Sequence, residues 1–160
     1  MLIFALPVSA HGGKASSGRD VSITISPFHL LNPELHVTGE FRLAPKMSIS
    51  ATLGAGRITD EGETCNIGEA VGQFRYYPLG SFAHGMMLGA DAGYVDMDAK
   101  IENPIAYLVG VHAGGFIGYK YSTKSGFTAE FQIGPIYLWG ESADTSELQT
   151  LFNLKIGWSL

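Results

Sequence analysis

Several features that often reveal a protein's function are scarce or absent in this sequence of 160 residues. A single cysteine, Cys65, excludes a disulfide within the chain and a cysteine metal cluster. Charged residues make up only 16% of the chain, and a net charge of −5 without any basic cluster argues against a nucleic-acid partner. No run approaches the roughly 18 apolar residues of a transmembrane helix, and no stretch repeats with a helical period. What remains is a glycine-rich chain, 46% hydrophobic, in which apolar and polar residues alternate.

Alternation is cleanest between Phe127 and Trp139. One face carries Phe127, Ala129, Phe131, Ile133, Pro135, Tyr137 and Trp139, and the other carries Thr128, Glu130, Gln132 and Gly134. A period of two residues is that of a β-strand with one apolar and one polar surface. At about 3.3 Å per residue, this strand is long enough to cross a bilayer, which takes roughly 9–11 tilted residues.

The same plan recurs in seven more segments, which predict strands at 20–26, 34–43, 47–56, 69–76, 86–94, 107–121 and 148–160. Connections are predicted at 59–66, 78–85, 96–104 and 122–126, with Cys65 exposed in the first of them. Eight predicted strands without a predicted helix indicate an all-β fold, and an even number of strands suits an up-and-down barrel. We expect an eight-stranded antiparallel up-and-down transmembrane β-barrel over residues 20–160, with both termini on one side.

The first residues have the pattern of a secretory signal. Leu2–Leu6 is a short apolar core, and Val8–Ala10 has the small residues that signal peptidase requires. We therefore expect residues 1–10 to be a signal peptide and residues 11–19 a flexible lead-in to the barrel. The charged n-region is missing, which is consistent with a truncated or misassigned start; a buried first strand is the alternative.

A period of two does not say which face points outward. A soluble lipocalin-like barrel would enclose a small apolar ligand with its apolar face, whereas a membrane barrel would turn that face to lipid. The apolar face carries no charge in the middle of any strand, and Ser, Thr, Gly and Gln dominate the polar face. Both observations favour a membrane barrel with a polar lumen.

The charged residues of the polar face are expected to fill this lumen. Each base would cost roughly 2–4 kcal/mol if it faced lipid near the midplane, so an inward position is favoured. The expected network consists of Glu40, Arg42, Glu69, Arg75, Asp91, His112, Lys120, Glu130 and Lys155. A plug of ion pairs is the preferred interpretation over a proton or ion path, because a barrel of about eight strands leaves little open lumen.

Aromatic residues occur toward both ends of the apolar face, as the two girdles of a membrane barrel do. The expected girdles are formed by Tyr76, Tyr119, Tyr121 and Trp158 at the end near the termini, and by Tyr94, Tyr107, Tyr137 and Trp139 at the other. In a lipocalin-like barrel the same residues would pack in the core, where a distribution over two ends is less natural.

Short motifs add a family resemblance. RYYP at Arg75–Pro78, GYK at Gly118–Lys120 and the ending KIGWSL, with Lys155 and Gly157, resemble the small outer-membrane β-barrels of Gram-negative bacteria, the outer membrane protein A and X types. The final residue, Leu160, departs from the Phe or Tyr of many members. The resemblance implies a bacterial outer-membrane location, contact with outer-membrane lipid and lipopolysaccharide, and recognition of the last strand by the barrel-assembly machinery.

Catalysis finds little support in the sequence. Lipid A deacylases of similar size use a His-x-Ser pair with a Glu, but Ala113 and Gly114 follow His112 and no His-x-Ser occurs. His112 and Glu130, on adjacent strands, would form an oriented base without a nucleophile. No loop has the spacing of a calcium site, and neither a metal nor a cofactor is expected. We therefore expect a non-enzymatic barrel with a structural or surface-interaction role; a lipid A-modifying enzyme and a soluble lipocalin-like binder are the alternatives.

Overall fold

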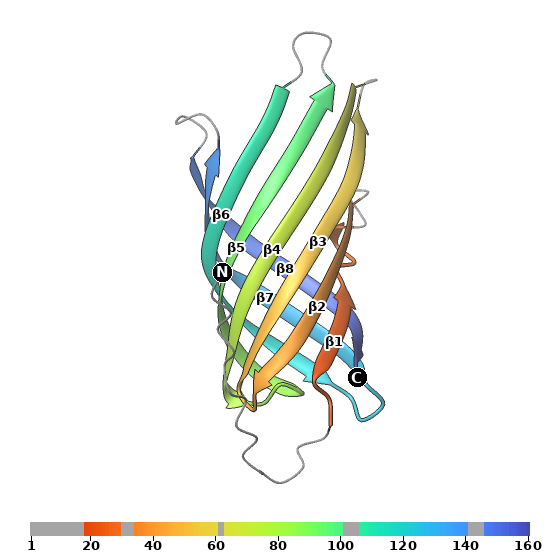
Figure 1. Cartoon of the computed structure of the whole chain (residues 1–160), viewed down its shortest axis with the longest axis vertical. Helices are drawn as coiled ribbons and strands as arrows, with labels where there is room; N and C mark the ends of the chain where they lie inside the picture. Colours follow the sequence, from red (N-terminus) through yellow and green to blue (C-terminus); the bar gives the residue numbers. More distant parts are fainter. Residues whose placement is uncertain (1–17, 30–33, 61–62, 101–105, 141–145) are drawn as a thin grey trace, which may run out of the picture.

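The protein folds into a closed barrel of eight antiparallel strands (Figure 1), seen in a computed structural model. The structure describes residues 18–29, 34–60, 63–100, 106–140 and 146–160. It does not describe the side chains of 58–60, 63–64, 98–100 and 106–108. The strands are β1 (Val21–Ile25), β2 (Glu34–Ala44), β3 (Met47–Asp60), β4 (Glu63–Gly80), β5 (His84–Lys100), β6 (Ala106–Ser122), β7 (Phe127–Gly140) and β8 (Glu147–Ser159). The predicted all-β, up-and-down architecture is confirmed. The predicted signal peptide and most of the lead-in lie outside the described residues.

The barrel closes where its first and last strands meet. Ile23 of β1 pairs with Trp158 of β8, and the backbone N–H of Asp20 donates to the carbonyl of Leu160 at 3.0 Å. Figure 1 shows the beginning of β1 and the C-terminus at the same end, which we call the terminal end. The guanidinium of Arg19 donates to the carbonyls of Thr123 and Lys124 there, so the last residue of the predicted lead-in is anchored to the barrel.

Strands at the opposite end, the far end, extend beyond their predicted limits. β3 continues to Asp60, where it pairs with Glu63, and β5 continues past Asp96 to Lys100. The loop predicted at 59–66 is therefore wrong for 59–60 and 63–66, which are strand residues. The loop predicted at 96–104 is wrong for 96–100. Cys65 lies half-buried in β4 and opposite Ala99, not in an exposed loop. An antiparallel ladder needs only paired backbone groups, so it continues where the outward residue is charged, as at Asp96.

At the terminal end, the predicted connection at 78–85 shrinks to residues 81–83. The pairing of β4 with β5 shifts between Tyr76 and Leu79, and Gly80 has a φ of 119°, a value that glycine adopts without strain. Tyr77 lies two positions after Arg75, on the same inward face of β4, and is fully buried. Among the described residues, the buried hydrophobic cluster consists of Tyr77, Phe82, Met87 and Phe116. Period two places Tyr77, Met87 and Phe116 on the inward faces of their strands, whereas Phe82 lies in the connection at 81–83; their packing into one apolar plug was not predicted.

The barrel is polar inside and apolar outside. Among the described residues, four hydrophobic side chains are buried against twenty polar or charged ones, and twenty-seven large hydrophobic side chains are exposed. On the outer wall, Leu53 is 68% and Phe41 is 53% exposed. The apolar face of each strand thus points outward, opposite to its direction in a lipocalin-like barrel. No helix among the described residues is long and apolar enough to cross a membrane.

The predicted girdle residues lie on this outer wall. The exposed ones are Tyr76, Tyr94, Tyr119, Tyr121, Tyr137, Trp139 and Trp158; the side chain of Tyr107 lies outside the described part. The register of the strands places one group of these aromatic residues near the terminal end and the other toward the far end. Phe127 and Trp158 meet edge to face at the terminal end with ring centroids 5.9 Å apart, and Tyr137 meets Trp139 at 4.7 Å toward the far end.

Candidate functional site in the lumen

Four charged side chains from four strands meet in the terminal half of the lumen. Arg75 Nη1 lies 2.9 Å from Glu40 Oε2 and 3.0 Å from Glu130 Oε2. Lys120 Nζ lies 2.6 Å from Glu40 Oε2 and 3.5 Å from Glu130 Oε1. All four side chains are completely buried. Two carboxylates and two cations balance in charge, which burial requires because an unpaired ion loses its hydration without compensation.

Neutral polar groups complete this central cluster. Tyr77 Oη donates to Glu40 Oε1 at 2.6 Å, and Ser48 Oγ donates to the same oxygen at 2.5 Å. Arg75 Nη2 donates to Gln73 Oε1 at 2.8 Å, and Gln73 in turn contacts Gln132. Each charge thus meets partners on several strands, so the cluster joins the barrel wall across its interior.

Lys155 of β8 lies next to this cluster, on the side of the far end. Its Nζ donates to Thr38 Oγ1 at 3.0 Å and to Thr52 Oγ1 at 3.5 Å, and the two hydroxyls are 2.7 Å apart. The ammonium is fully buried and also borders the cavity beyond it. Lys155 therefore forms the boundary between the central cluster and the cavity.

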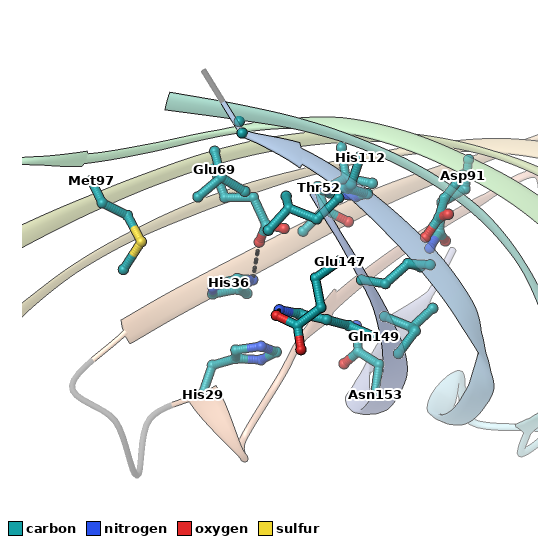
Figure 2. Close-up of a pocket in the computed structure, with 18 of the residues that line it drawn as sticks. His29, His36, Thr52, Glu69, Asp91, Met97, His112, Glu147, Gln149 and Asn153 are labelled. Carbon is teal, nitrogen blue, oxygen red and sulfur yellow. Dashed lines mark hydrogen bonds and ion pairs between the residues drawn. The ribbon is translucent and has the colours of Figure 1, made fainter. Parts of the chain in front are cut away.

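A cavity of about 530 Å³ occupies the far half of the lumen (Figure 2). Its polar lining includes Asp91 and His112, which are both buried, and Asp91 Oδ1 has no hydrogen-bond partner among the described residues. Apolar side chains make up another part of the wall: Val71, Val95, Met97, Ile136, Leu138 and Leu151. The far half of the lumen is therefore amphipathic rather than uniformly polar.

Two histidines and two glutamates gather at one side of this cavity. His36 Nδ1 lies 3.1 Å from Glu69 Oε2, the contact drawn as a dashed line in Figure 2, and His36 Nε2 lies 3.3 Å from Glu34 Oε2. His29, which follows β1, stacks on His36 with ring centroids 3.8 Å apart and planes 15° from parallel. Burial, reinforced by the neighbouring His36, lowers the pKa of His29, so its imidazole is neutral at neutral pH.

The residues expected to form one lumen network fall into three places. Glu40, Arg75, Lys120 and Glu130 form the central cluster with Lys155 beside it, whereas Glu69, Asp91 and His112 line the cavity. Arg42 forms an ion pair with Asp20 at the terminal end.

The predicted pairing of His112 with Glu130 is wrong. Glu130 lies opposite Lys120, whereas His112 lies opposite Leu138, eight positions further along β7. Two strands being neighbours does not make two residues neighbours, since antiparallel register decides the height of each one.

The apolar part of the cavity and the histidine pair were not predicted. A signal for the apolar wall is present in β7: Ile136 and Leu138 lie on the face that carries Glu130 and Gln132, so this face becomes apolar toward Trp139. For the histidines the sequence holds only a weak signal: His29 follows the first predicted strand and His36 lies in the second.

Comparisons with known proteins give no relative for this chain: no family model, no curated protein and no solved structure matches it. Its function must be argued from the lumen and the outer wall alone.

Proposed function

We propose that this chain is an outer-membrane β-barrel protein of a Gram-negative bacterium, without enzymatic activity, that serves a structural or surface-interaction role. The observation that carries this proposal is the distribution of side chains described above. Exposed apolar patches larger than a few hundred Å² are rare on soluble monomers. Here all eight strands expose large hydrophobic side chains, while six charged side chains in the described part of the chain are buried inside: Glu40, Arg75, Asp91, Lys120, Glu130 and Lys155. Lipid is the environment that suits such a wall.

The dimensions of the strands agree with this proposal. β7 contains 14 residues. At about 3.3 Å per residue and a tilt of about 40°, such a strand rises about 35 Å along the barrel axis. This exceeds the apolar band of about 25 Å that outer-membrane barrels present to lipid. The excess leaves room for aromatic residues at both borders of the band.

The filled terminal half of the lumen supports a plugged barrel rather than an ion path. Tyr77, Met87, Arg75 and Lys120 are all 0% exposed at this level. The side chains hold one another through direct ion pairs and hydrogen bonds, and conduction would require several of these to break together. The partners that fit this barrel are outer-membrane lipid, lipopolysaccharide at the far end, and the assembly machinery that receives the last strand.

The lining of the cavity supports the assignment as a non-enzyme. Thr52 provides the one hydroxyl among the described residues that line it, and this oxygen is already bonded to Thr38 and Lys155. Catalysis by a Ser or Thr nucleophile needs a hydroxyl that a general base can activate. His112 and Asp91 therefore line the cavity without such a free hydroxyl among the described residues.

Membrane insertion tests the proposal directly. The chain is expressed with a secretion signal, and membranes are separated by density. We expect it in the outer-membrane fraction, extractable only with detergent, and with a folded form that migrates differently from the boiled form on a gel. A chain that is folded and soluble without detergent would refute the membrane assignment. Altered lipid A in expressing cells, compared with cells carrying an empty vector, would refute the assignment as a non-enzyme.

A further inference from the structure

The ligand atoms of three side chains converge at the far end of the lumen. His29, Glu34 and His36 each offer one nitrogen or oxygen atom, and these atoms all lie within 4.8 Å of one another. Glu34 and His36 are two positions apart on β2, so they share a face, and the chain after β1 places His29 over His36. The cluster is distinct from the ion pairs of the central cluster.

We propose that His29, Glu34 and His36 bind one divalent transition-metal ion, and that Zn²⁺ is the ion that suits them best. Two imidazoles and one carboxylate form a ligand set found in zinc proteins that leave a fourth position to water or an exogenous ligand. Calcium and magnesium prefer oxygen ligands throughout, which the two histidines cannot supply. The inference concerns the folded barrel and does not depend on the membrane assignment.

The contacts of His36 provide the first argument. Its Nδ1 faces Glu69 at 3.1 Å, and its Nε2 faces Glu34 at 3.3 Å. The His36 Nε2 and Glu34 Oε2 atoms face each other at hydrogen-bonding distance. A cation bound between them would be coordinated by both. Their 3.3 Å separation matches the roughly 3.3 Å between two ligands that hold a tetrahedral zinc at about 2.0–2.1 Å.

Glu69 supplies the second argument. Metal-bound histidines usually donate their other ring N–H to a carboxylate, which fixes the tautomer and the ring orientation. Glu69 is in that position toward His36 (Figure 2). Gly54 lies opposite His36 in the pairing of β2 with β3, and a Cβ there would lie 2.8 Å from His36 Nε2. The missing side chain at Gly54 thus provides the space that the imidazole occupies.

His29 supplies the third ligand. Its Nδ1 is buried and has no hydrogen-bond partner among the described residues, so this nitrogen has no other role in the structure. The two rings are stacked nearly parallel, and the ligand nitrogen of His29 lies within 4.8 Å of the ligand atoms of Glu34 and His36, so a movement of this side chain would complete the set. His29 and His36 both border the cavity, from which the fourth ligand would come.

Metal binding to the purified barrel tests this proposal. Protein without a histidine tag is folded in detergent, treated with EDTA and dialysed against ZnCl₂, and bound zinc is measured by mass spectrometry. We expect one zinc per chain, unaffected by a large excess of Mg²⁺ or Ca²⁺. His29→Ala and His36→Ala should each weaken binding at least tenfold. Glu69→Gln, which leaves the three ligands in place, should weaken it about 10–100-fold.

Controls separate the site from adventitious binding. His112→Ala, in the same cavity, and His84→Ala, at the terminal end, should bind zinc like the unchanged protein. Gly54→Ala keeps all ligands but displaces the His36 ring, so it should weaken binding. Co²⁺ in place of zinc should show the visible absorption of a four-coordinate ion. Folded protein that binds no zinc, or a His29→Ala/His36→Ala double variant that binds it unchanged, would overturn the proposal.

Discussion

At the scale of single residues, Glu40 shows most clearly what the lumen requires. Its carboxylate meets two cations, Arg75 and Lys120, and accepts hydrogen bonds from Tyr77 and Ser48, with no exposure to solvent. Removing one partner of a buried ion pair leaves an uncompensated charge, whereas removing both is often tolerated. We therefore expect that neutralising Glu40 alone is more harmful than neutralising Glu40 and Lys120 together.

Glu40→Gln is expected to destabilise the barrel by about 3–5 kcal/mol, because it leaves two buried cations against the single carboxylate of Glu130. Adding Lys120→Met to this variant should recover a large part of the loss, since Arg75 and Glu130 then remain as a balanced pair. Urea unfolding from lipid vesicles, followed by tryptophan fluorescence, measures both free energies.

Asp20→Asn is the matched control for that experiment. Asp20 forms an ion pair with Arg42 at the terminal end, where the carboxylate side chain is 63% exposed. Exposed pairs contribute at most about 1 kcal/mol. If Glu40→Gln cost no more than Asp20→Asn, the central cluster would not be the stabilising network described here.

At the scale of one strand, β8 has adjacent residues in two environments, the outer wall and the lumen. Phe152 is 51% exposed on the outer wall and packs edge to face against Phe131 at 5.3 Å. Leu151, its neighbour, points inward and lines the cavity. The two residues therefore compare the outer wall with the lumen at the same height of one strand.

Phe152→Arg should impair folding into liposomes far more than Leu151→Arg. On the outer wall, a guanidinium near the midplane costs roughly 2–4 kcal/mol. In the cavity, the new arginine has room and lies among carboxylates, including Asp91 and Glu147. The yield of the heat-modifiable folded form measures the difference. Equal yields, or a lower yield for Leu151→Arg, would contradict the lipid-facing assignment of the wall.

At the scale of the whole molecule, the two ends of the barrel differ. The terminal end has short connections at 45–46, 81–83 and 123–126, and side chains fill the lumen next to it. The far end holds the cavity and the proposed metal site, and Figure 1 shows β4, β5 and β6 rising highest there. In outer-membrane barrels short turns face the periplasm, so we expect the far end on the cell surface.

Cysteine labelling of intact cells tests this orientation. Because Cys65 is half-buried in β4, it is first replaced in Cys65→Ser. A membrane-impermeant maleimide should then label Ser146→Cys, an exposed position next to β8 at the far end, without lysis. Lys124→Cys, exposed at the terminal end, should be labelled only after lysis. The reverse pattern would invert the proposed topology.

The sequence alone determined which residues share a face, because in a strand the side chains alternate whatever the neighbouring strands are. Glu130 and Gln132 on one face, Phe131 and Ile133 on the other, could be assigned before any contact was known, and the closed eight-stranded barrel followed from repeating that pattern. The limits of the strands were less predictable. Ladder hydrogen bonds extended β3 to Asp60 and β5 to Lys100. In β5 the polar residues change face there: Asp96 is exposed, whereas Val95 and Met97 line the cavity.

Only the tertiary structure decided which inward residues meet. Register set the height of each side chain: it joined Glu40 to Lys120, eighty positions apart in the chain, and separated His112 from Glu130. Period two already placed Tyr77 inward, two positions after Arg75, but only the tertiary structure packed it with Phe82, Met87 and Phe116 into an apolar plug. The tertiary structure also placed His29 and His36 beside the cavity in the far half of the lumen. Direction is a local property of a strand, whereas contact across a lumen depends on the register of all eight.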